Sequence, residues 1–255
     1  MVKLKTDTSI EAMRETGRVV ARLLTAAREA AAVGVSLREL DEVARGVLRD
    51  AGAGSPFLNY RPHFAPTPFP AVICASVNDA IVHGIPTDQR LRDGDLVSID
   101  AGATLGGWAG DSAISFTVGR AGPDDTRLVE TAFAALEAGI AAAVVGNRIG
   151  DIAHAIGTVC RGAGYGIPEG FGGHGIGRSM HEDPAVPNEG RPGRGMLLRH
   201  GMVLAIEPML IGSGKDDFYP DQDGWTLRTS DGSRAAHAEH TVAITDDGPR
   251  ILTAL

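Results

Sequence analysis

The sequence has few cysteines and no long hydrophobic run. Its 255 residues include two cysteines, Cys74 and Cys160, which are too few for a disulfide scaffold of this size and fit free thiols in a reducing compartment. The longest uncharged stretch, 62–78, is interrupted by prolines, so no transmembrane helix is expected. The start of the chain lacks the apolar run of a signal peptide. We therefore expect a protein of the cytoplasm.

The sequence also lacks an excess of positive charge. It contains 24 Lys and Arg residues against 32 Asp and Glu residues, for a formal net charge of -8, which disfavours nucleic acid and anionic membranes as direct partners. Hydrophobic residues make up 43% and charged residues 22%, as in folded globular proteins rather than disordered chains. The length permits one large domain or two small ones. These features predict an ordered domain of the size of an enzyme.

The first half of the chain is predicted to contain two helices followed by strands. Thr8 with Glu11, and Ser36 with Glu39, form the capping-box pattern that marks helix N-termini. Apolar residues then recur at helical spacing after each box. We expect helices at 8–34 and 36–50, strands at 71–75, 96–100 and 113–118, and a glycine-rich turn at 102–110.

The second half repeats this plan of two helices and then strands. We expect helices at 124–145 and 149–162, and strands at 202–207, 225–227 and 239–245. The repetition predicts two halves, about 1–122 and 123–255, that face each other across a pseudo-two-fold axis within a single domain of residues 1–255. Antiparallel strands covered by two helix pairs make this an α+β fold.

Four acidic residues occupy repeated positions in the two halves. Asp100 and Glu207 each end a run of apolar or small residues, and Asp111 and Glu239 each begin the next strand. An unpaired carboxylate in a buried strand costs several kcal/mol, on the order of the penalty for a desolvated charge. No arginine occupies a repeated position in the neighbouring strands, and four converging carboxylates would force some of them to be protonated. A pair of divalent metal ions resolves this conflict.

Two histidines lie in a glycine-rich segment of the second half. His174 and His181 belong to Gly172–Glu182, where glycines permit a tight loop or strand edge that holds a histidine toward a ligand. Residues seven positions apart cannot share one face of a strand. We therefore expect one of the two to be a metal ligand and the other to contact substrate.

Several short motifs occur in this order along almost the whole chain, from about Thr8 to Thr253. They are Val82-His83-Gly84-Ile85-Pro86, the pair Asp100 and Asp111, Gly173-His174-Gly175-Ile176-Gly177 followed by His181, Ile206-Glu207-Pro208-Met209, Asp223-Gly224-Trp225 and Glu239-His240-Thr241. In combination they resemble the type I methionine aminopeptidases of the pita-bread fold. Type II enzymes carry a long insertion between the two metal-binding glutamates, whereas Glu207 and Glu239 are only 32 residues apart, which favours type I. The start of the chain resembles the short bacterial form.

The resemblance implies a dinuclear metal site. Asp111 and Glu239 would bridge two divalent ions. Asp100 would complete the ligands of one ion, and His174 and Glu207 those of the other. One histidine with four carboxylates suits Co, Mn, Fe or Zn better than copper. A water molecule activated by the ions would attack the first peptide carbonyl of the substrate.

The resemblance also implies roles for individual side chains. Glu207 would carry a proton, His181 would contact the oxygen of the tetrahedral intermediate, and His83 would approach the scissile amide. The pocket for the methionine side chain would be apolar, and its expected residues are Cys74, Phe69 and Trp225, with Tyr60 or Met180 as further candidates. The expected function is co-translational removal of N-terminal methionine from nascent proteins, at the ribosome, when the second residue is small. The enzyme would be a monomer.

Two residues depart from the family pattern, and two other functions compete. Ala109 stands where histidine often precedes the Gly-Asp pair, and His237 stands where glutamine is usual. These departures bear on the shape of the pocket and on the pH response rather than on the reaction. The competing functions are an Xaa-Pro aminopeptidase or prolidase-like peptidase, which normally has a large additional N-terminal domain, and a non-catalytic pita-bread binding protein.

Overall fold

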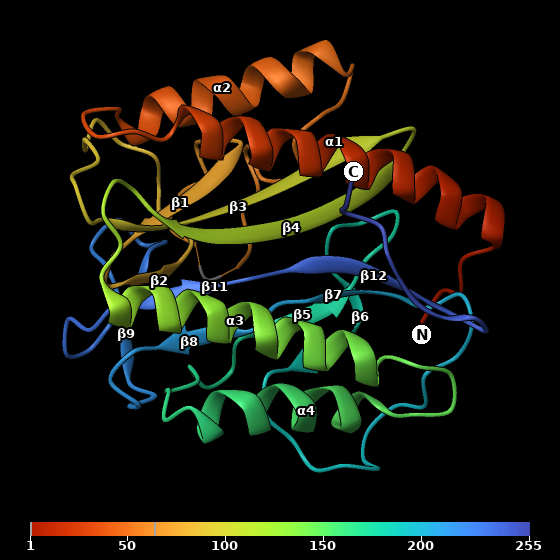
Figure 1. Ribbon diagram of the computed structural model, residues 1–255. Coiled ribbons are helices and arrows are strands. Elements are labelled where there is room, and N and C mark those ends of the chain that lie inside the picture. The colour runs from red at the N-terminus through yellow and green to blue at the C-terminus, as the bar shows by residue number, and fades with distance from the viewer. Residues whose placement is uncertain (1, 64) are drawn as a thin grey trace.

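The computed structural model describes residues 2–63 and 65–255. Its helices are α1 (Asp7–Ala30), α2 (Leu37–Asp50), α3 (Pro123–Ala142) and α4 (Ile149–Gly162). Its strands are β1 (Ile73–Val77), β2 (Ala80–Val82), β3 (Leu96–Leu105), β4 (Trp108–Thr117), β5 (Gly172–Gly175), β6 (Glu182–Pro187), β7 (Val203–Ile206), β8 (Met209–Ile211), β9 (Phe218–Pro220), β10 (Leu227–Thr229), β11 (Ala235–His237), β12 (His240–Thr245) and β13 (Gly248–Ile251). Figure 1 shows α1 and α2 on one outer side, α3 and α4 on the opposite side, and the strands between them.

The strands form two principal sheets and two small ones. The principal sheets have the orders β1-β3-β4 and β13-β12-β7-β5-β6, and the small ones are β2-β10-β9 and β11-β8. All of the pairings between these strands are antiparallel. An isolated β-bridge between Ala113 and Glu239 connects the two principal sheets. The predicted α+β class, with antiparallel strands and two helix pairs, is confirmed.

Local capping explains where the first two helices begin. The predicted box at α2 is present, because Ser36 Oγ accepts the amide of Glu39 at 3.2 Å and Glu39 Oε2 accepts the amide of Ser36 at 2.8 Å. The box predicted at Thr8 is wrong. The N-cap of α1 is Thr6, whose hydroxyl accepts the amide of Ser9, so the helix begins at Asp7.

The turn between β3 and β4 is much shorter than the glycine-rich turn predicted at 102–110. Leu105 pairs with Trp108, so only Gly106 and Gly107 form the turn, with φ angles of 58° and 76°. Two successive positive φ angles are what a two-residue hairpin turn requires. The other glycines of 102–110 lie inside the strands. Gly110, for example, faces the backbone of α1, and a Cβ there would lie 3.4 Å from the amide nitrogen of Gly17.

Gly17 lets α1 pack closely against the C-terminal segment, and this predicts an effect on stability. A Cβ at Gly17 would collide with the backbone carbonyl of Leu252. We expect Gly17→Ala to lower the free energy of unfolding by about 1–3 kcal/mol, the usual cost of overpacking. Gly46→Ala in α2 is the matched control, because its nearest neighbour would be 3.7 Å away, and it should stabilise by about 0.5–1 kcal/mol. Urea unfolding followed by circular dichroism measures both, and equal stability of the two variants would contradict the packing argument.

Each half of the molecule has its own apolar core. One core lies between the pair α1 and α2 and the sheet β1-β3-β4, and the other between the pair α3 and α4 and strands β7 and β12. A smaller cluster joins the halves, since Ile10 and Met13 of α1 and Ala109 of β4 pack with Val203 and Ala243. Among the residues described, no helix has both the length and the apolar character needed to cross a membrane.

Candidate active site

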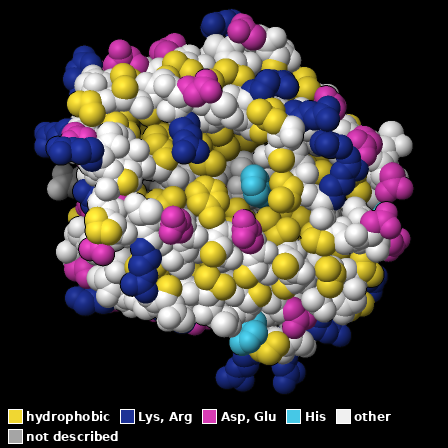
Figure 2. Space-filling view, viewed as in Figure 1, with side chains coloured by type: hydrophobic (Ala, Val, Ile, Leu, Met, Phe, Trp, Pro, Cys, Tyr) yellow, Lys and Arg dark blue, Asp and Glu magenta, His cyan; other side chains and the backbone are white. Residues whose placement is uncertain are grey.

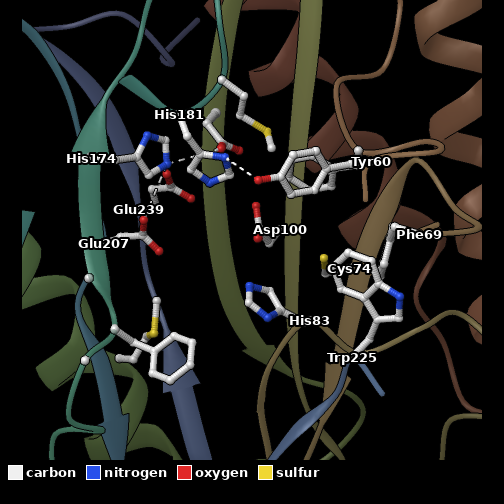
Figure 3. Close-up of a pocket in the computed structure, with 17 residues that line it drawn as sticks. Tyr60, Phe69, Cys74, His83, Asp100, His174, His181, Glu207, Trp225 and Glu239 are labelled. Atoms are coloured by element: carbon white, nitrogen blue, oxygen red, sulfur yellow. Dashed lines mark hydrogen bonds and ion pairs between the residues drawn. The ribbon is translucent and has the colours of Figure 1, made fainter. Parts of the chain in front are cut away.

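A cavity of about 340 Å³ lies where the two halves of the fold meet. Figure 2 shows this face of the molecule hollowed near its middle, with hydrophobic side chains and a histidine visible there. Every residue that the sequence placed in the site lines the cavity: Asp100, Asp111, His174, Glu207 and Glu239, His83 and His181, and Tyr60, Phe69, Cys74, Met180 and Trp225. The fold therefore brings together side chains from segments far apart in the sequence (Figure 3).

Strand register places the two aspartates side by side. Asp100 of β3 pairs with Ala113 of β4, and Asp111 pairs with Gly102. The two aspartates are therefore diagonal neighbours on one face of the sheet. Thr241 Oγ1 accepts the backbone amide of Asp111 at 3.0 Å and donates to its carbonyl at 2.7 Å, which attaches this part of β4 to the second sheet.

The second sheet supplies the two glutamates. His240 pairs with Ile206, so Glu239 and Glu207 lie next to each other at the ends of β12 and β7. Glu239 also exchanges backbone hydrogen bonds with Ala113, and its amide lies 3.0 Å from the Ala113 carbonyl. This bridge carries Glu239 to the aspartates of the first sheet. The four carboxylates converge where the two sheets meet.

These carboxylates are buried or partly buried and lack enough partners for their charge. Asp111 is 4% exposed and Glu239 is 2% exposed, and among the described residues Oδ1 of Asp100, Oδ1 of Asp111 and Oε1 of Glu239 make no hydrogen bond. Burial raises the pKa of Asp100 to about 7 and that of Glu207 to about 8. Burial and the neighbouring carboxylates also raise the pKa values of Asp111 and Glu239. Such a cluster fits divalent cations, whose binding would release protons from it.

His174 of β5 presents a nitrogen to this cluster. Its Nδ1 lies 2.9 Å from the carbonyl oxygen of Gly175, which can only accept a hydrogen bond, so Nδ1 carries the proton. Its Nε2 lies 3.6 Å from Oε1 of Glu207 and 3.9 Å from Oδ2 of Asp111. Potential ligand atoms of Asp111, His174 and Glu239 all lie within 4.8 Å of one another. The donor set of oxygens and one imidazole nitrogen fits Mn, Fe, Co or Zn.

His181 lies at the entrance of the cavity, in the loop before β6. Its ring centroid is 4.3 Å from that of His174, and its Nδ1 lies 3.3 Å from the hydroxyl of Tyr60. The neighbouring Glu182 holds the loop, because its carboxylate accepts the amide of Arg178 at 2.9 Å and binds the buried ammonium of Lys5 at 2.8 Å. His181 is therefore exposed to an incoming substrate but held by a fixed loop.

His83 approaches the cavity from the opposite side, after β2. Its φ of 61° is unusual for a residue other than glycine and occurs where the surrounding structure imposes it. Its ring packs edge-on against Trp225 and Phe171, with centroid distances of 6.4 Å and 6.3 Å. Burial lowers the pKa of His83 to about 4, and the charges of His237 and His181 add to this effect. The ring is therefore neutral at physiological pH.

An apolar pocket adjoins the carboxylates (Figure 3). Phe69 and Trp225 pack edge to face with ring centroids 5.0 Å apart, and the ring of Tyr60 is 6.5 Å from that of Trp225. Cys74 is 5% exposed, and burial raises the pKa of its thiol well above the usual value, so this side chain acts as a small apolar group.

Three further apolar side chains line the cavity and were not predicted. They are Phe57, Phe171 and Met209. Met209 is the last residue of the motif around Glu207, and Phe171 precedes the glycines before His174, so the motifs could have identified both. Phe57 lies in an irregular segment without a periodic pattern, and the sequence carries no signal for it.

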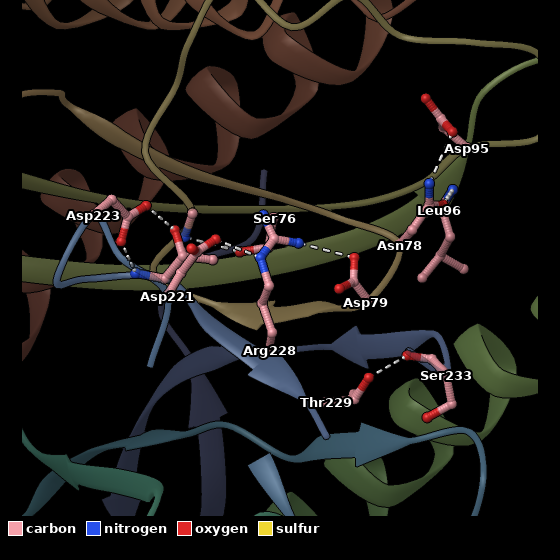
Figure 4. Close-up of polar contacts among 12 residues, drawn as sticks. Ser76, Asn78, Asp79, Asp95, Leu96, Asp221, Asp223, Arg228, Thr229 and Ser233 are labelled. Atoms are coloured by element: carbon pink, nitrogen blue, oxygen red, sulfur yellow. Dashed lines mark hydrogen bonds and ion pairs between the residues drawn. The ribbon is translucent and has the colours of Figure 1, made fainter. Parts of the chain in front are cut away.

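A polar network holds Trp225 at the pocket. Oδ1 of Asp223 accepts the backbone amide of Trp225 at 2.8 Å. In the adjoining strand β10, Arg228 binds Asp221 at 2.5 Å and Asp79 at 2.9 Å (Figure 4). These pairs attach the Trp225 loop to the segment after β1, beside the loop that carries His83.

Comparison with known proteins assigns the chain to a family. The sequence model of metallopeptidase family M24 matches residues 11–246. Methionine aminopeptidase 1 of Mycobacterium tuberculosis is 56% identical over 252 residues, which cover 96% of this chain and 92% of the relative. The crystal structure of methionine aminopeptidase from Thermotoga maritima has a TM-score of 0.95 at 36% identity and covers 100% of both chains. The chain belongs to the methionine aminopeptidases of family M24.

The predicted resemblance to methionine aminopeptidases and the pita-bread fold are thereby confirmed. The prolidase of Pyrococcus furiosus has a TM-score of 0.77 at 23% identity, and the chain covers 65% of its length. At that identity the likeness shows the fold alone. The methionine aminopeptidases, in contrast, match along the full length of the chain and are enzymes, which favours them over both competing functions.

Proposed function

We propose that this methionine aminopeptidase removes the N-terminal methionine from nascent proteins whose second residue is small, with two divalent metal ions as cofactors. The convergence of four carboxylates, two of them buried, and one imidazole beside an apolar pocket supports the proposal most strongly. The ligands would be distributed as the family resemblance implies: Asp111 and Glu239 between the ions, Asp100 on one ion, and His174 and Glu207 on the other. Bound there, Co, Mn, Fe or Zn ions would lower the pKa of a water molecule and so would supply a hydroxide nucleophile at neutral pH.

The protein's own side chains have separate tasks in this mechanism. The apolar pocket of Phe69, Cys74 and Trp225 holds the methionine side chain. Glu207 accepts the proton of the attacking water and passes it to the leaving amine. His181 donates a hydrogen bond to the oxygen of the tetrahedral intermediate, and His83 binds the scissile amide.

Substrate selectivity tests the proposed pocket. We expect Met-Ala-Ser to be cleaved far faster than Lys-Ala-Ser, because an ammonium group in the pocket would lack a partner and cost several kcal/mol, on the order of desolvating an ion. Leu-Ala-Ser should be disfavoured by less, about 1–3 kcal/mol, the usual value of a small difference in shape. The measurement is kcat/KM with added Mn or Co. Comparable values for the Met and Lys peptides would refute the apolar pocket.

The second residue of the substrate is tested in the same assay. Peptides Met-Xaa-Ser with Xaa from Gly to Trp should be cleaved only when Xaa is small, and an Xaa-Pro peptide serves as the control for prolidase-like activity. Efficient cleavage before Trp would refute the rule for small residues. Cleavage of the Xaa-Pro peptide in preference to Met-Ala-Ser would favour the competing function.

The proposal extends to the setting of the reaction. We propose that residues 1–255 form a single catalytic domain, which the buried contacts of Ile10, Met13, Ala109, Val203 and Ala243 across the two halves support. We further propose that the enzyme is a monomer and meets nascent chains in the cytoplasm at the ribosome. Light scattering after size-exclusion chromatography tests the monomer, and co-sedimentation with translating ribosomes tests the association.

A further inference from the structure

His237 is a buried histidine that the proposed mechanism does not use. It is 1% exposed, and its Nε2 lies 3.5 Å from Oε2 of Glu207. Within residues 2–63 and 65–255, this Nε2 makes no hydrogen bond. Leaving a buried polar atom unpaired costs about 1–3 kcal/mol. A role at the site would explain why the position carries an imidazole.

The backbone around His237 is tightly fixed. His237 of β11 pairs with Met209 of β8, two residues after Glu207, so His237 and Glu207 are diagonal neighbours across these segments. The hydroxyl of Ser115 accepts the amide of His237 at 2.9 Å and donates to its carbonyl at 2.7 Å. The hydroxyl of Ser98 in turn lies 2.7 Å from that of Ser115. Strands β8 and β4 therefore fix the backbone of His237, and this places its ring beside Glu207.

The two oxygens of Glu207 face two different histidines. Oε1 lies 3.6 Å from Nε2 of His174, whereas Oε2 lies 3.5 Å from Nε2 of His237. His174 and Glu207 line the cavity, and His237 is not among the described residues that do so. Glu207 therefore stands between the cavity and the ring of His237, with one oxygen toward each (Figure 3 shows Glu207 and His174).

We propose that His237 is a positioning residue for Glu207. Its Nε2–H donates a hydrogen bond to Oε2, so that Oε1 remains turned toward His174 and the cavity. A contraction of a few tenths of an ångström brings the contact into the ordinary range of about 2.7–3.2 Å. Hydrogen bonds of this kind orient carboxylate ligands and influence their metal affinity. The inference rests on the proposed function, in which Glu207 is a ligand and the carrier of the proton, and His237 itself keeps its proton throughout.

The alternative to this proposal is that His237 binds a metal ion directly. Potential ligand atoms of Glu207, His237 and Glu239 lie within 4.8 Å of one another. The position of His237 behind Glu207, outside the cavity lining of the described chain, favours positioning over ligation. The two roles predict different effects of His237→Gln. A glutamine amide can donate the hydrogen bond to Glu207, but it is a poor replacement for an imidazole as a metal ligand.

The test compares His237→Gln, His237→Asn and His237→Leu in the full-length, metal-loaded enzyme. Gln can reach Oε2 with its amide, Asn has the same amide on a chain one carbon shorter, and Leu has no donor. Three quantities are measured: the Mn(II) dissociation constants by calorimetry, kcat and KM for Met-Ala-Ser, and the visible absorption spectrum of the Co(II) form. The amide-bearing Asn variant keeps the test valid if the Leu variant does not fold.

We expect the Asn and Leu variants to lose about 10–100-fold in Mn(II) affinity and in kcat, the usual cost of losing an outer hydrogen bond to a metal ligand. KM should change little, because His237 is not among the described residues that line the cavity for the peptide. The Gln variant should recover most of both quantities and keep the Co(II) spectrum of the wild type, since the ligands are unchanged.

Two results would overturn the inference. A Leu or Asn variant with wild-type affinity and kcat would show that the contact has no role. A Gln variant with an altered Co(II) spectrum and a lost metal ion would show that His237 is a ligand instead. Failure of the wild type itself to bind metal or cleave Met-Ala-Ser would be a different outcome, because it would remove the proposed function and this inference with it.

Discussion

Asp111→Asn should lose bound metal and turnover together. Asp111 is 4% exposed, its Oδ2 faces His174, and it adjoins Asp100 in the cluster of carboxylates. An amide in its place removes a negative charge and one ligand oxygen at a position proposed to serve both ions. The loss should exceed the roughly 10–100-fold that removal of an outer hydrogen bond costs. Metal analysis after dialysis and kcat/KM for Met-Ala-Ser measure it.

The companion variant Asp100→Asn distinguishes a bridging ligand from a terminal one. Asp100 is proposed to bind a single ion, so its variant should keep the other ion and part of the activity. Both substitutions replace a carboxylate by an amide of nearly the same shape, so thermal unfolding of the metal-free proteins should show that each variant folds. An Asp111→Asn enzyme that is active without bound metal would contradict the assignment of the cluster as a metal site.

His181→Ala should fold and bind metal normally but turn over at least about a hundredfold more slowly, the usual scale for removing one donor to a developing oxyanion. The side chain lies at the entrance of the cavity beside His174 and Tyr60, and its loop is held independently by Glu182. Removal of the ring should therefore leave the carboxylates in place. The measurements are kcat for Met-Ala-Ser and metal content.

The control for His181→Ala is His154→Ala, which removes an exposed histidine from α4, outside the residues that line the cavity in the described structure. It should have the activity of the wild type. If His181→Ala instead lost metal while its remaining metal-bound fraction had an unchanged kcat, His181 would be a ligand and not an oxyanion donor.

The sequence alone predicted the four helices, the strands that became β1, β3, β4, β7 and β12, and the carboxylates of the cavity. The capping box at Ser36 operates within a single turn of helix, so local residues suffice to predict it. Asp100 and Glu207 end apolar runs, a pattern whose cost in a buried strand can be recognised without a structure. The carboxylates could therefore be predicted to converge, because only convergence on cations makes such positions tolerable.

Only the tertiary structure decided the features that depend on contacts between distant segments. The glycines of 102–110 were expected in a turn, yet Gly110 lies within a strand because α1 packs against it at Gly17. Phe57 reaches the pocket from an irregular segment whose path no periodic pattern reveals. The contact between His237 and Glu207 arises from the register of β11 with β8. Register and packing depend on which surfaces meet after the chain has folded, whereas helix caps and strand-ending acids act on their immediate neighbours.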